Sequence, residues 1–485
     1  MSPWNRTRLL TAASAASAAA LLSACAAVGP NFAPPAAPKT SGYAMAGDAA
    51  SKVPALGAQA GASGDWWTAL GSPDLDRTIK QALSDSPTLA VADATLLQAR
   101  AEANAERPTP EGAFDASAQR TRINLAAYGI PGFPSPTVNQ YVIGGNISYD
   151  IDLFGGLRRT TETYEARAAA EAQHAKAAYL TLSGNVAMAA VRIATLRAEI
   201  AAIQSVIDED AKNIDFIRKA EAAGGAAPAA QVSARAQMVQ DQAKLPDLNQ
   251  QLAEARHNLA LLVGHAPSDW TAPEFDLAAL TLPASIPVEL PSELVRRRPD
   301  ILAAEADLHA ATAAIGVETA KLYPDVKLNA GWAQTSLEPE KLFQYEFSGW
   351  NFGPAFSVPL FNRGQLKARV RVAEAAAKVA NARYQVTVLN AFTQVSDVLA
   401  ALANDEAAVA AQDQARQVAE QDLKNVEFAY TNGGGTLIEV TQAQRRLSET
   451  RQAYALAQGK RYADAIRLYV ATAADWSQPA RTASN

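Results

Sequence analysis

The chain has 485 residues, a formal net charge of −6 and one cysteine. An acidic balance argues against nucleic acid as a partner, because binding to phosphates needs a basic surface. The abundance of Ala, Leu, Gln, Glu and Arg favours long helices. Beyond the first residues there is no uninterrupted apolar run of about 18 residues, so the sequence predicts no transmembrane helix.

The N-terminus has the features of a bacterial lipoprotein signal. Arg6 and Arg8 precede a segment of apolar and small residues that ends in Leu22-Ser23-Ala24-Cys25. We therefore expect residues 1–24 to be a signal peptide and Cys25 to carry covalent lipid. The alternative is an ordinary secretory signal next to a cysteine without a role.

Lipid on Cys25 would leave no thiol for a disulfide, a metal cluster or catalysis. Ala26 follows the cysteine, which in such lipoproteins usually means transfer to the outer membrane. Residues 25–64 are rich in Pro, Ala and Gly, and this composition predicts an extended, lipid-anchored tether.

The remainder of the chain contains an internal repeat. The segment Ile151–Arg158 resembles Val358–Lys367, and further matches keep an offset of roughly 207–209 residues. We expect a first repeat over residues 65–264, a linker over 265–291 and a second repeat over 292–476. Each repeat is predicted to contain an entry helix, a pair of strands and a long helical hairpin.

The predicted strand pairs cover residues 113–153 and 325–361. In residues 141–153 apolar and aromatic side chains occupy the odd positions and mostly polar ones the even positions, which is typical of a strand between lipid and water. A small soluble sheet packed on helices is the alternative. Four strands cannot close a barrel, and an open edge cannot lie in lipid, so several chains would share one barrel.

The predicted helical hairpins cover residues 157–264 and 365–470, after entry helices near 75–107 and 292–323. The first long helix has one interior glycine, Gly184, and an apolar seam with alternating steps of 4 and 3 residues that is interrupted at Asp210. Pro246 should kink its return helix. The acidic run 208–210 is interpreted as a solvated helix face, with an acidic tunnel lining as the alternative.

Three motifs together resemble the outer-membrane factor family of tripartite efflux pumps, the TolC-like and NodT-like lipoproteins. They are Asp65-Trp66-Trp67, Asp152-Leu153-Phe154-Gly155 and Arg297-Arg298-Pro299-Asp300-Ile301. The resemblance implies a mainly α fold with a transmembrane β-barrel. Three chains would form a homotrimer with a shared 12-stranded barrel and a 12-helix periplasmic coiled-coil tunnel.

The resemblance also implies a function, a location and partners. The chain would be a passive conduit in the Gram-negative outer membrane that exports drugs or other small toxic molecules. Its partners would be a periplasmic adaptor protein, an inner-membrane RND-type pump and outer-membrane lipid. The cargo and the cognate partners are not predicted.

Family members use the hairpin ends to contact the adaptor, which here makes Gly224, Gly225, Tyr430, Gly433 and Gly434 the candidate contact residues. Glycines in tight turns, and a tyrosine that only packs, would explain the same residues without any contact. The family's acidic residues after the second turn are missing, because Gly435 and residues 441–445 depart from its pattern. Glu439 is a weak substitute for them.

The sequence contains no nucleotide-binding loop, Gly-x-Ser-x-Gly motif or zinc motif, and its four histidines are scattered. We therefore expect no catalytic residue, no metal site and no cofactor besides the lipid on Cys25. Two other classes stay open, which are a lipid-anchored periplasmic coiled-coil scaffold and an outer-membrane lipoprotein enzyme with a helical body.

Overall fold

The computed structural model describes residues 27–36, 38, 40, 42–43, 45, 65–122, 137–224, 227–283 and 291–472. The chain divides into two compact units. The sheet unit consists of Met1–Pro35, Leu97–Ala170 and Ala304–Tyr384, and the hairpin unit consists of Ala36–Leu96, Glu171–Ala303 and Gln385–Asn485. Each unit takes segments from both halves of the chain.

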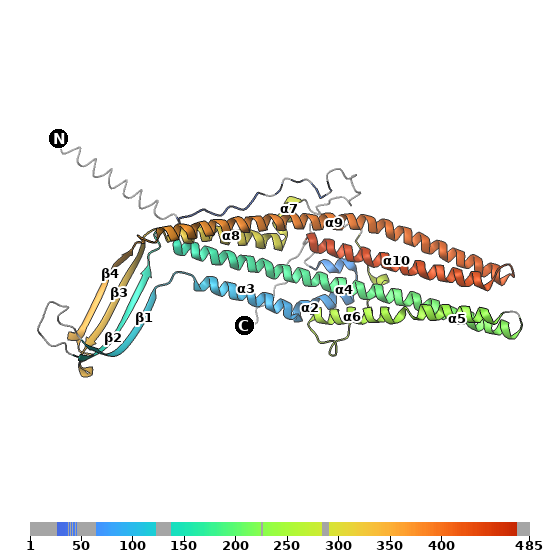
Figure 1. Ribbon diagram of the computed structural model, residues 1–485, viewed down its shortest axis with the longest axis horizontal. Coiled ribbons are helices and arrows are strands. Elements are labelled where there is room, and N and C mark those ends of the chain that lie inside the picture. Colours follow the sequence, from blue (N-terminus) through green and yellow to red (C-terminus); the bar gives the residue numbers. More distant parts are fainter. Residues whose placement is uncertain are drawn as a thin grey trace, which may run out of the picture. The chain divides into compact units, whose positions relative to one another are not determined.

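The described chain is mainly helical, as the sequence predicted (Figure 1). The long α-helices are α3 (Pro87–Ala105), α4 (Gly156–Ala222), α5 (Pro228–Gln242), α6 (Leu245–Val263), α8 (Pro299–Ala320), α9 (Arg363–Thr431) and α10 (Leu437–Thr472). The shorter helices are η1 (Trp66–Leu70), α2 (Pro73–Asp85), η3 (Leu277–Ala279), α7 (Pro291–Arg297), η4 (Pro339–Lys341) and η5 (Tyr345–Phe347).

Prolines divide three helical segments. The single entry helix expected near 75–107 is wrong, because Ser86 is extended ahead of Pro87 and separates α2 from α3. Likewise Arg298, ahead of Pro299, separates α7 from α8. A proline disfavours helical geometry at the residue before it, which explains both breaks. Pro246 was predicted to kink its return helix, and the structure shows a complete break there, between the end of α5 and the start of α6.

Four strands form one antiparallel sheet in the order β1 (Glu111–Arg122), β2 (Thr137–Asp150), β3 (Asp325–Ser336) and β4 (Ser348–Ser357). The register places Phe114 opposite Gly145, Gly145 opposite Trp332, and Trp332 opposite Trp350. The apolar residues that alternate along each strand therefore lie on one face of the whole sheet.

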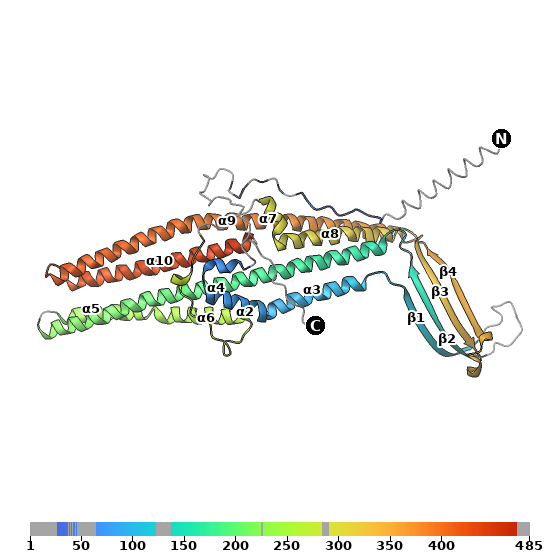
Figure 2. The same ribbon diagram turned by 180° about the vertical axis from the view of Figure 1, so that it is seen from behind.

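This apolar face is uncovered in the described chain. Trp350, Phe352 and Phe356 are 81%, 67% and 69% exposed. Figures 1 and 2 show no α-helix across either face of the sheet among the described residues. A soluble sheet packed on helices would bury this face, so that alternative does not fit the structure. β1 and β4 are the edge strands.

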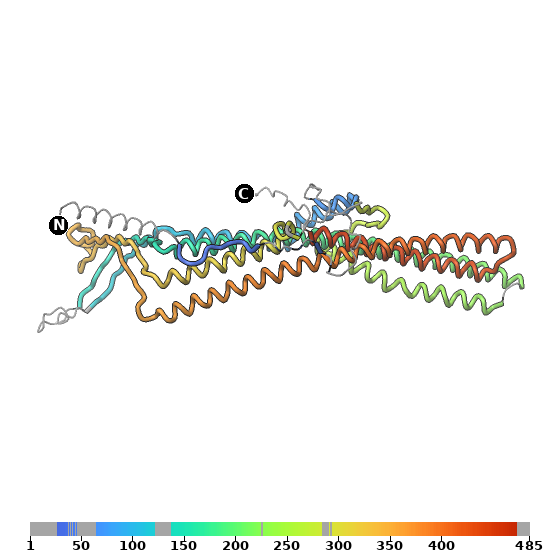
Figure 3. The backbone as a smooth tube through the Cα atoms, turned by 90° about the horizontal axis from the view of Figure 1, so that it is seen from above, coloured from blue at the N-terminus to red at the C-terminus, as the bar shows by residue number. Residues whose placement is uncertain are grey.

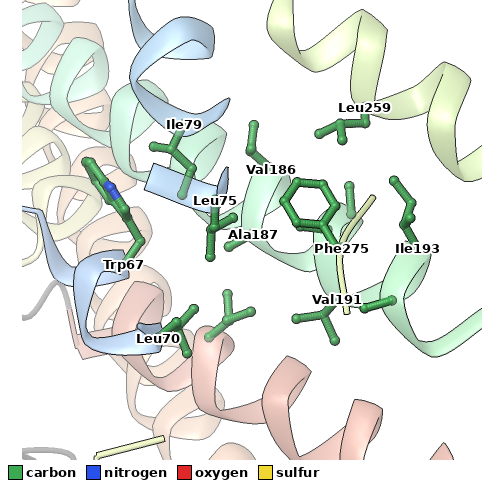
Figure 4. Close-up of a cluster of buried hydrophobic side chains, with 14 of the residues drawn as sticks. Trp67, Leu70, Leu75, Ile79, Val186, Ala187, Val191, Ile193, Leu259 and Phe275 are labelled. Atoms are coloured by element: carbon green, nitrogen blue, oxygen red, sulfur yellow. The ribbon is translucent and has the colours of Figure 1, made fainter. Parts of the chain in front are cut away.

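The largest core belongs to the hairpin unit. Figure 4 shows side chains from η1 and α2 that meet apolar residues of α4, together with Leu259 and Phe275. Trp66 and Trp67 are each 1% exposed. Trp66 stacks on Tyr469 of α10 with a centroid distance of 5.2 Å, and its Nε1 donates to Ser183 Oγ at 3.3 Å. The Asp65-Trp66-Trp67 motif thus fixes η1 against α4 and α10.

Two glycines allow α4 and α10 to approach closely. A Cβ built on Gly184 would lie 2.5 Å from Val470 Cγ2, and one built on Gly459 would lie 2.1 Å from Thr195 Oγ1. Gly184, the one interior glycine noted in the sequence of this helix, therefore has a packing role. Figures 1 and 3 show α9 and α10 side by side up to their common turn.

One helix, α9, includes a stretch that is long and apolar enough to cross a bilayer by length and composition, and 28% of that stretch is buried. The sequence prediction counted only uninterrupted apolar runs. It missed this stretch, because a helix with few charged residues can reach a high mean hydropathy without such a run.

Replacing Gly459 by Ala should lower the free energy of unfolding by about 1–2 kcal/mol, because overpacking against Thr195 outweighs the gain in helix propensity. Urea unfolding in detergent measures the change. The control is Gly364→Ala in α9, where a built Cβ meets nothing within 4 Å, and this variant should be as stable as the wild type or more stable. Equal effects of the two variants would contradict a packing role for Gly459.

Candidate functional site at the helical hairpin ends

The first hairpin turn follows the end of α4 at Ala222. Gly224 adopts φ 78° and its N–H donates to the carbonyl of Glu221 at 2.9 Å. A Cβ built there meets nothing within 4 Å, so the backbone conformation and not crowding favours glycine. Gly225, the second predicted contact residue of this turn, lies outside the described residues. Pro228 then begins α5.

The second turn closes α9 with a Schellman motif. Gly433 adopts φ 77° and donates to the carbonyl of Tyr430 at 3.1 Å, while Gly434 donates to the carbonyl of Ala429 at 2.9 Å. Gly434 itself has no positive φ. The two glycines therefore differ, because only Gly433 is constrained by its backbone.

A capping box begins α10 directly after this turn. The Thr436 N–H donates to Glu439 Oε2 at 2.7 Å, and the Glu439 N–H donates to Thr436 Oγ1 at 3.3 Å. The hydrogen bond from the Thr436 backbone holds the pKa of Glu439 below its usual value. Glu439, the weak substitute for the family's acidic residues, thus has a local structural role.

Tyr430 packs between the two hairpins. Its ring meets the edge of Phe216 of α4, with centroids 5.9 Å apart and planes inclined by 76°. Both residues line a groove that is bordered mainly by small and apolar side chains of α4, α5 and α10, including Ile217, Ala234, Leu437 and Ile438. The tyrosine is half-buried there, which leaves part of its ring at the surface.

A buried polar cluster links the hairpins beside this groove. Arg445 of α10 lies 3.7 Å from Asp210 of α4 and 3.5 Å from Asp241 of α5. Asn213 of α4 donates to Thr441 Oγ1 at 3.1 Å and to Gln444 Oε1 at 3.2 Å. Arg445 thus lies between two buried carboxylates of the other hairpin, and Asp241 has a second cationic partner in Lys244 at 2.8 Å.

Burial raises the pKa of Asp210, the nearby Asp241 raises it further, and Arg445 opposes both effects. The interpretation of residues 208–210 as a solvated face is therefore wrong for Asp210, which is 5% exposed, although Asp208 is exposed. The apolar seam contained the missed signal, because Asp210 occupies a position in its 4 and 3 spacing. A charged residue at a seam position is buried and needs a partner.

Cys25, the predicted lipid-attachment residue, lies outside the described residues. The segment that follows it, residues 27–35, is described, and we call it the strap. The Val28 N–H donates to the carbonyl of Phe154 at 2.9 Å, and Ala27 lies against Gly155, whose φ is 77°. Arg159, which is 3% exposed, donates to the carbonyls of the strap. The strap thus begins where the sheet meets α4.

Phe32 of the strap also stacks on His309 of α8 at 4.4 Å, and His309 Nε2 lies 2.9 Å from Glu162 Oε1. Two other histidines, His174 of α4 and His257 of α6, lie exposed on helix surfaces. Within the described ranges, no group of three or more His, Cys, Asp or Glu residues is arranged to hold a metal ion.

A family model described as outer membrane efflux protein matches residues 78–265 and 290–474. The chain belongs to the outer membrane efflux protein family. The family resemblance of the sequence motifs is thereby confirmed, and so is the function at this level, an outer-membrane efflux channel.

Individual relatives agree with this assignment. The probable outer membrane lipoprotein SilC of Salmonella typhimurium is 26% identical over 94% of this chain and 97% of SilC. The toluene efflux pump outer membrane protein TtgI of Pseudomonas putida is 27% identical over 84% of this chain and 86% of TtgI. The cation efflux system protein CusC of Escherichia coli is 28% identical over 71% of this chain and 75% of CusC.

A crystal structure of CusC, described in connection with transmembrane channel formation, is similar to this chain with a TM-score of 0.78 and 25% identity. The match covers 92% of this chain and 99% of that chain. The TolC-like fold class and the outer-membrane location are therefore confirmed. The family members found are channel proteins and not enzymes. The scaffold and enzyme alternatives therefore have no counterpart among these relatives.

In this efflux family member, Gly433→Ala should lower the free energy of unfolding by about 1–2 kcal/mol, because alanine is strained at positive φ. Gly434→Ala, one position later, should change it by less than about 0.5 kcal/mol. Urea unfolding of the two variants measures the difference. A similar loss in both would show that crowding, and not backbone conformation, selects glycine in this turn.

The free energy of unfolding of Asp210→Asn, measured relative to that of the wild type, should increase as the pH rises from about 4 to 7. The folded-state pKa of Asp210 is raised, so its contribution to stability is greatest below its unfolded pKa and decreases as the pH rises toward the folded value. Urea unfolding at a series of pH values measures this difference.

Asp208→Asn, two residues away and exposed, is the control and should follow the wild type at every pH. If Asp210→Asn is less stable than wild type throughout, attraction to Arg445 outweighs the cost of burying the carboxylate.

Proposed function

We propose that three copies of this chain form the outer-membrane duct of a tripartite efflux system. Each would contribute four strands to a 12-stranded barrel and two hairpins to a 12-helix tunnel. The observation that carries the proposal is the open sheet with an exposed aromatic face and two edge strands. In hydrocarbon the edges need partners, and neighbouring copies can supply them by pairing β1 with β4.

Within the chain we propose two repeats, 65–264 and 292–476, with residues 265–291 as their linker. The family model matches two separate segments, 78–265 and 290–474, which supports this division. Signal peptide 1–24 would be removed, and residues 25–64 would tether the lipidated Cys25 to the helices. The position of the strap supports this arrangement, because Ala27 lies at the junction of sheet and helix, where the barrel would leave the membrane.

The hairpin ends would contact the periplasmic adaptor, which connects the duct to an inner-membrane RND-type pump. Gly224, Gly225, Gly433 and Gly434 would provide a close backbone surface, and Tyr430 a half-exposed ring. Small and apolar side chains around the groove at Tyr430 suit docking of another helical hairpin. The polar cluster around Arg445 would hold the two hairpins together until the adaptor docks.

The duct would be a passive conduit, with neither a catalytic site nor a cofactor besides the lipid. The cargo would be chosen by the pump, since the names of similar proteins refer to cargoes as different as toluene and cations. The shared fold therefore supports small-molecule efflux without specifying a compound.

Deleting the gene should sensitise cells to several compounds in a panel of drugs, dyes, bile salts and metal ions, and the wild-type gene should restore resistance. Purified protein should conduct in planar bilayers, because a barrel spans the membrane by itself. Absence of conductance would contradict the duct proposal. Conductance without sensitisation of the deletion strain would indicate a cargo outside the panel.

Two variants in the complemented strain separate the parts of the proposal. Cys25→Ala tests whether the anchor is needed for resistance. Gly434→Trp adds bulk where the backbone is unstrained, so it should retain conductance but reduce resistance at least tenfold if the adaptor contacts this turn. The matched control is Gly364→Trp, in the first turn of α9 and away from the hairpin ends.

A further inference from the structure

The base of the sheet unit carries an exposed basic surface on α9. Arg363, Lys367 and Arg371 follow each other at intervals of four residues, and all three are exposed. None of the three forms an ion pair within the part of the chain that the structure describes. Since four residues advance a helix by roughly 40° beyond a full turn, the three side chains lie on one face. We call this face the basic stripe.

The basic stripe directly follows an apolar collar. β4 ends at Ser357, and Val358, Leu360 and Phe361 are 49%, 68% and 101% exposed. Exposed apolar residues followed by clustered cations are the pattern of a membrane–water interface. At 1.5 Å per residue the stripe extends about 12 Å along α9, compared with a headgroup layer of about 5–8 Å, and long side chains can reach back toward it.

The sheet unit also indicates which side of α9 the stripe faces. A groove between α4, α8 and α9 is lined by Tyr164, Arg167, Val317, Arg369 and Val372 among others. On α9 the stripe lies roughly 165° around the helix from the groove-lining residues. On α4 the strap contacts Arg159, on a face roughly 90° from the centre of the groove-lining residues. The stripe and the strap therefore both lie away from the groove.

The strap connects this side to lipid, because Cys25 lies two residues before Ala27, at most about 7 Å of chain. We propose that Arg363, Lys367 and Arg371 form a binding surface for anionic phospholipid headgroups in the periplasmic leaflet of the outer membrane. This inference rests on the proposed function, since it requires the sheet to span that membrane. Attraction between several cations and anionic headgroups would fix the depth and tilt of the duct.

The test uses the full-length protein reconstituted in vesicles of phosphatidylethanolamine and phosphatidylglycerol at 3:1, then re-extracted in mild detergent. Mass spectrometry of the retained lipid gives the ratio of phosphatidylglycerol to phosphatidylethanolamine, and this ratio measures the preference for phosphatidylglycerol. Each neutralised residue should lower this preference about fivefold, so R363Q/K367Q/R371Q should lower it on the order of 100-fold. The preference of the wild type should also weaken with salt.

Two controls remove the same charge elsewhere on α9. Arg369→Gln lies between stripe residues but lines the groove, and Lys378→Gln lies about 22 Å from the start of the helix, beyond the headgroup layer. Both should keep the wild-type preference. R363K/K367R/R371K should keep it as well, because the attraction depends on charge and not on side-chain shape.

The proposal is overturned if the triple variant keeps the wild-type preference for phosphatidylglycerol. It is also overturned if Arg369→Gln loses as much of this preference as the triple variant does. It is also overturned if the triple variant changes the anion-to-cation permeability ratio in planar bilayers while the lipid preference stays, since the stripe would then face the tunnel. Should the triple variant fail to insert, Lys367→Gln alone must still show the fivefold loss. Wild-type protein without conductance would contradict the proposed duct independently, because its lipid preference is measured separately.

Discussion

A sheet in hydrocarbon must satisfy every backbone N–H and C=O from within protein, and in the proposed duct this requirement would govern the sheet unit. The register satisfies it across three antiparallel pairs and leaves only the outer edges of β1 and β4. The same register brings the apolar residues of all four strands onto one face. Gly145 lies between Phe114 and Trp332 in this register, which leaves room for large side chains on both sides.

The hairpin unit differs from the sheet unit, because each helix forms its backbone hydrogen bonds within itself. Side chains therefore determine how its helices pack. Its apolar core surrounds η1, and glycines bring α4 and α10 together where a β-carbon would clash. Near the hairpin ends the core gives way to Arg445 between Asp210 and Asp241. A buried ion cluster adds little stability but penalises misaligned helices strongly, so it suits a place where register matters.

Surface chemistry in the sheet unit changes in a consistent order from the sheet to the helices. Exposed aromatic residues cover the sheet, an apolar collar follows β4, and cations begin with α9. The strap reaches the same junction from the other end of the chain, held by Arg159 and Phe32. Chain segments far apart in sequence thus meet at the level where the duct would leave the membrane.

The sequence by itself determined the elements whose signal is local. Alternation in residues 141–153 predicted a strand, the 4 and 3 spacing predicted the long helices, and Gly224 and Gly433 marked turns, because side-chain period and positive φ are set by neighbouring residues. Only the tertiary structure decided which residues from distant segments contact each other. Asp210 is buried because α5 and α10 face it, and Gly184 is needed because Val470 packs against it. Burial and strain depend on contacts between distant segments, which no local pattern specifies.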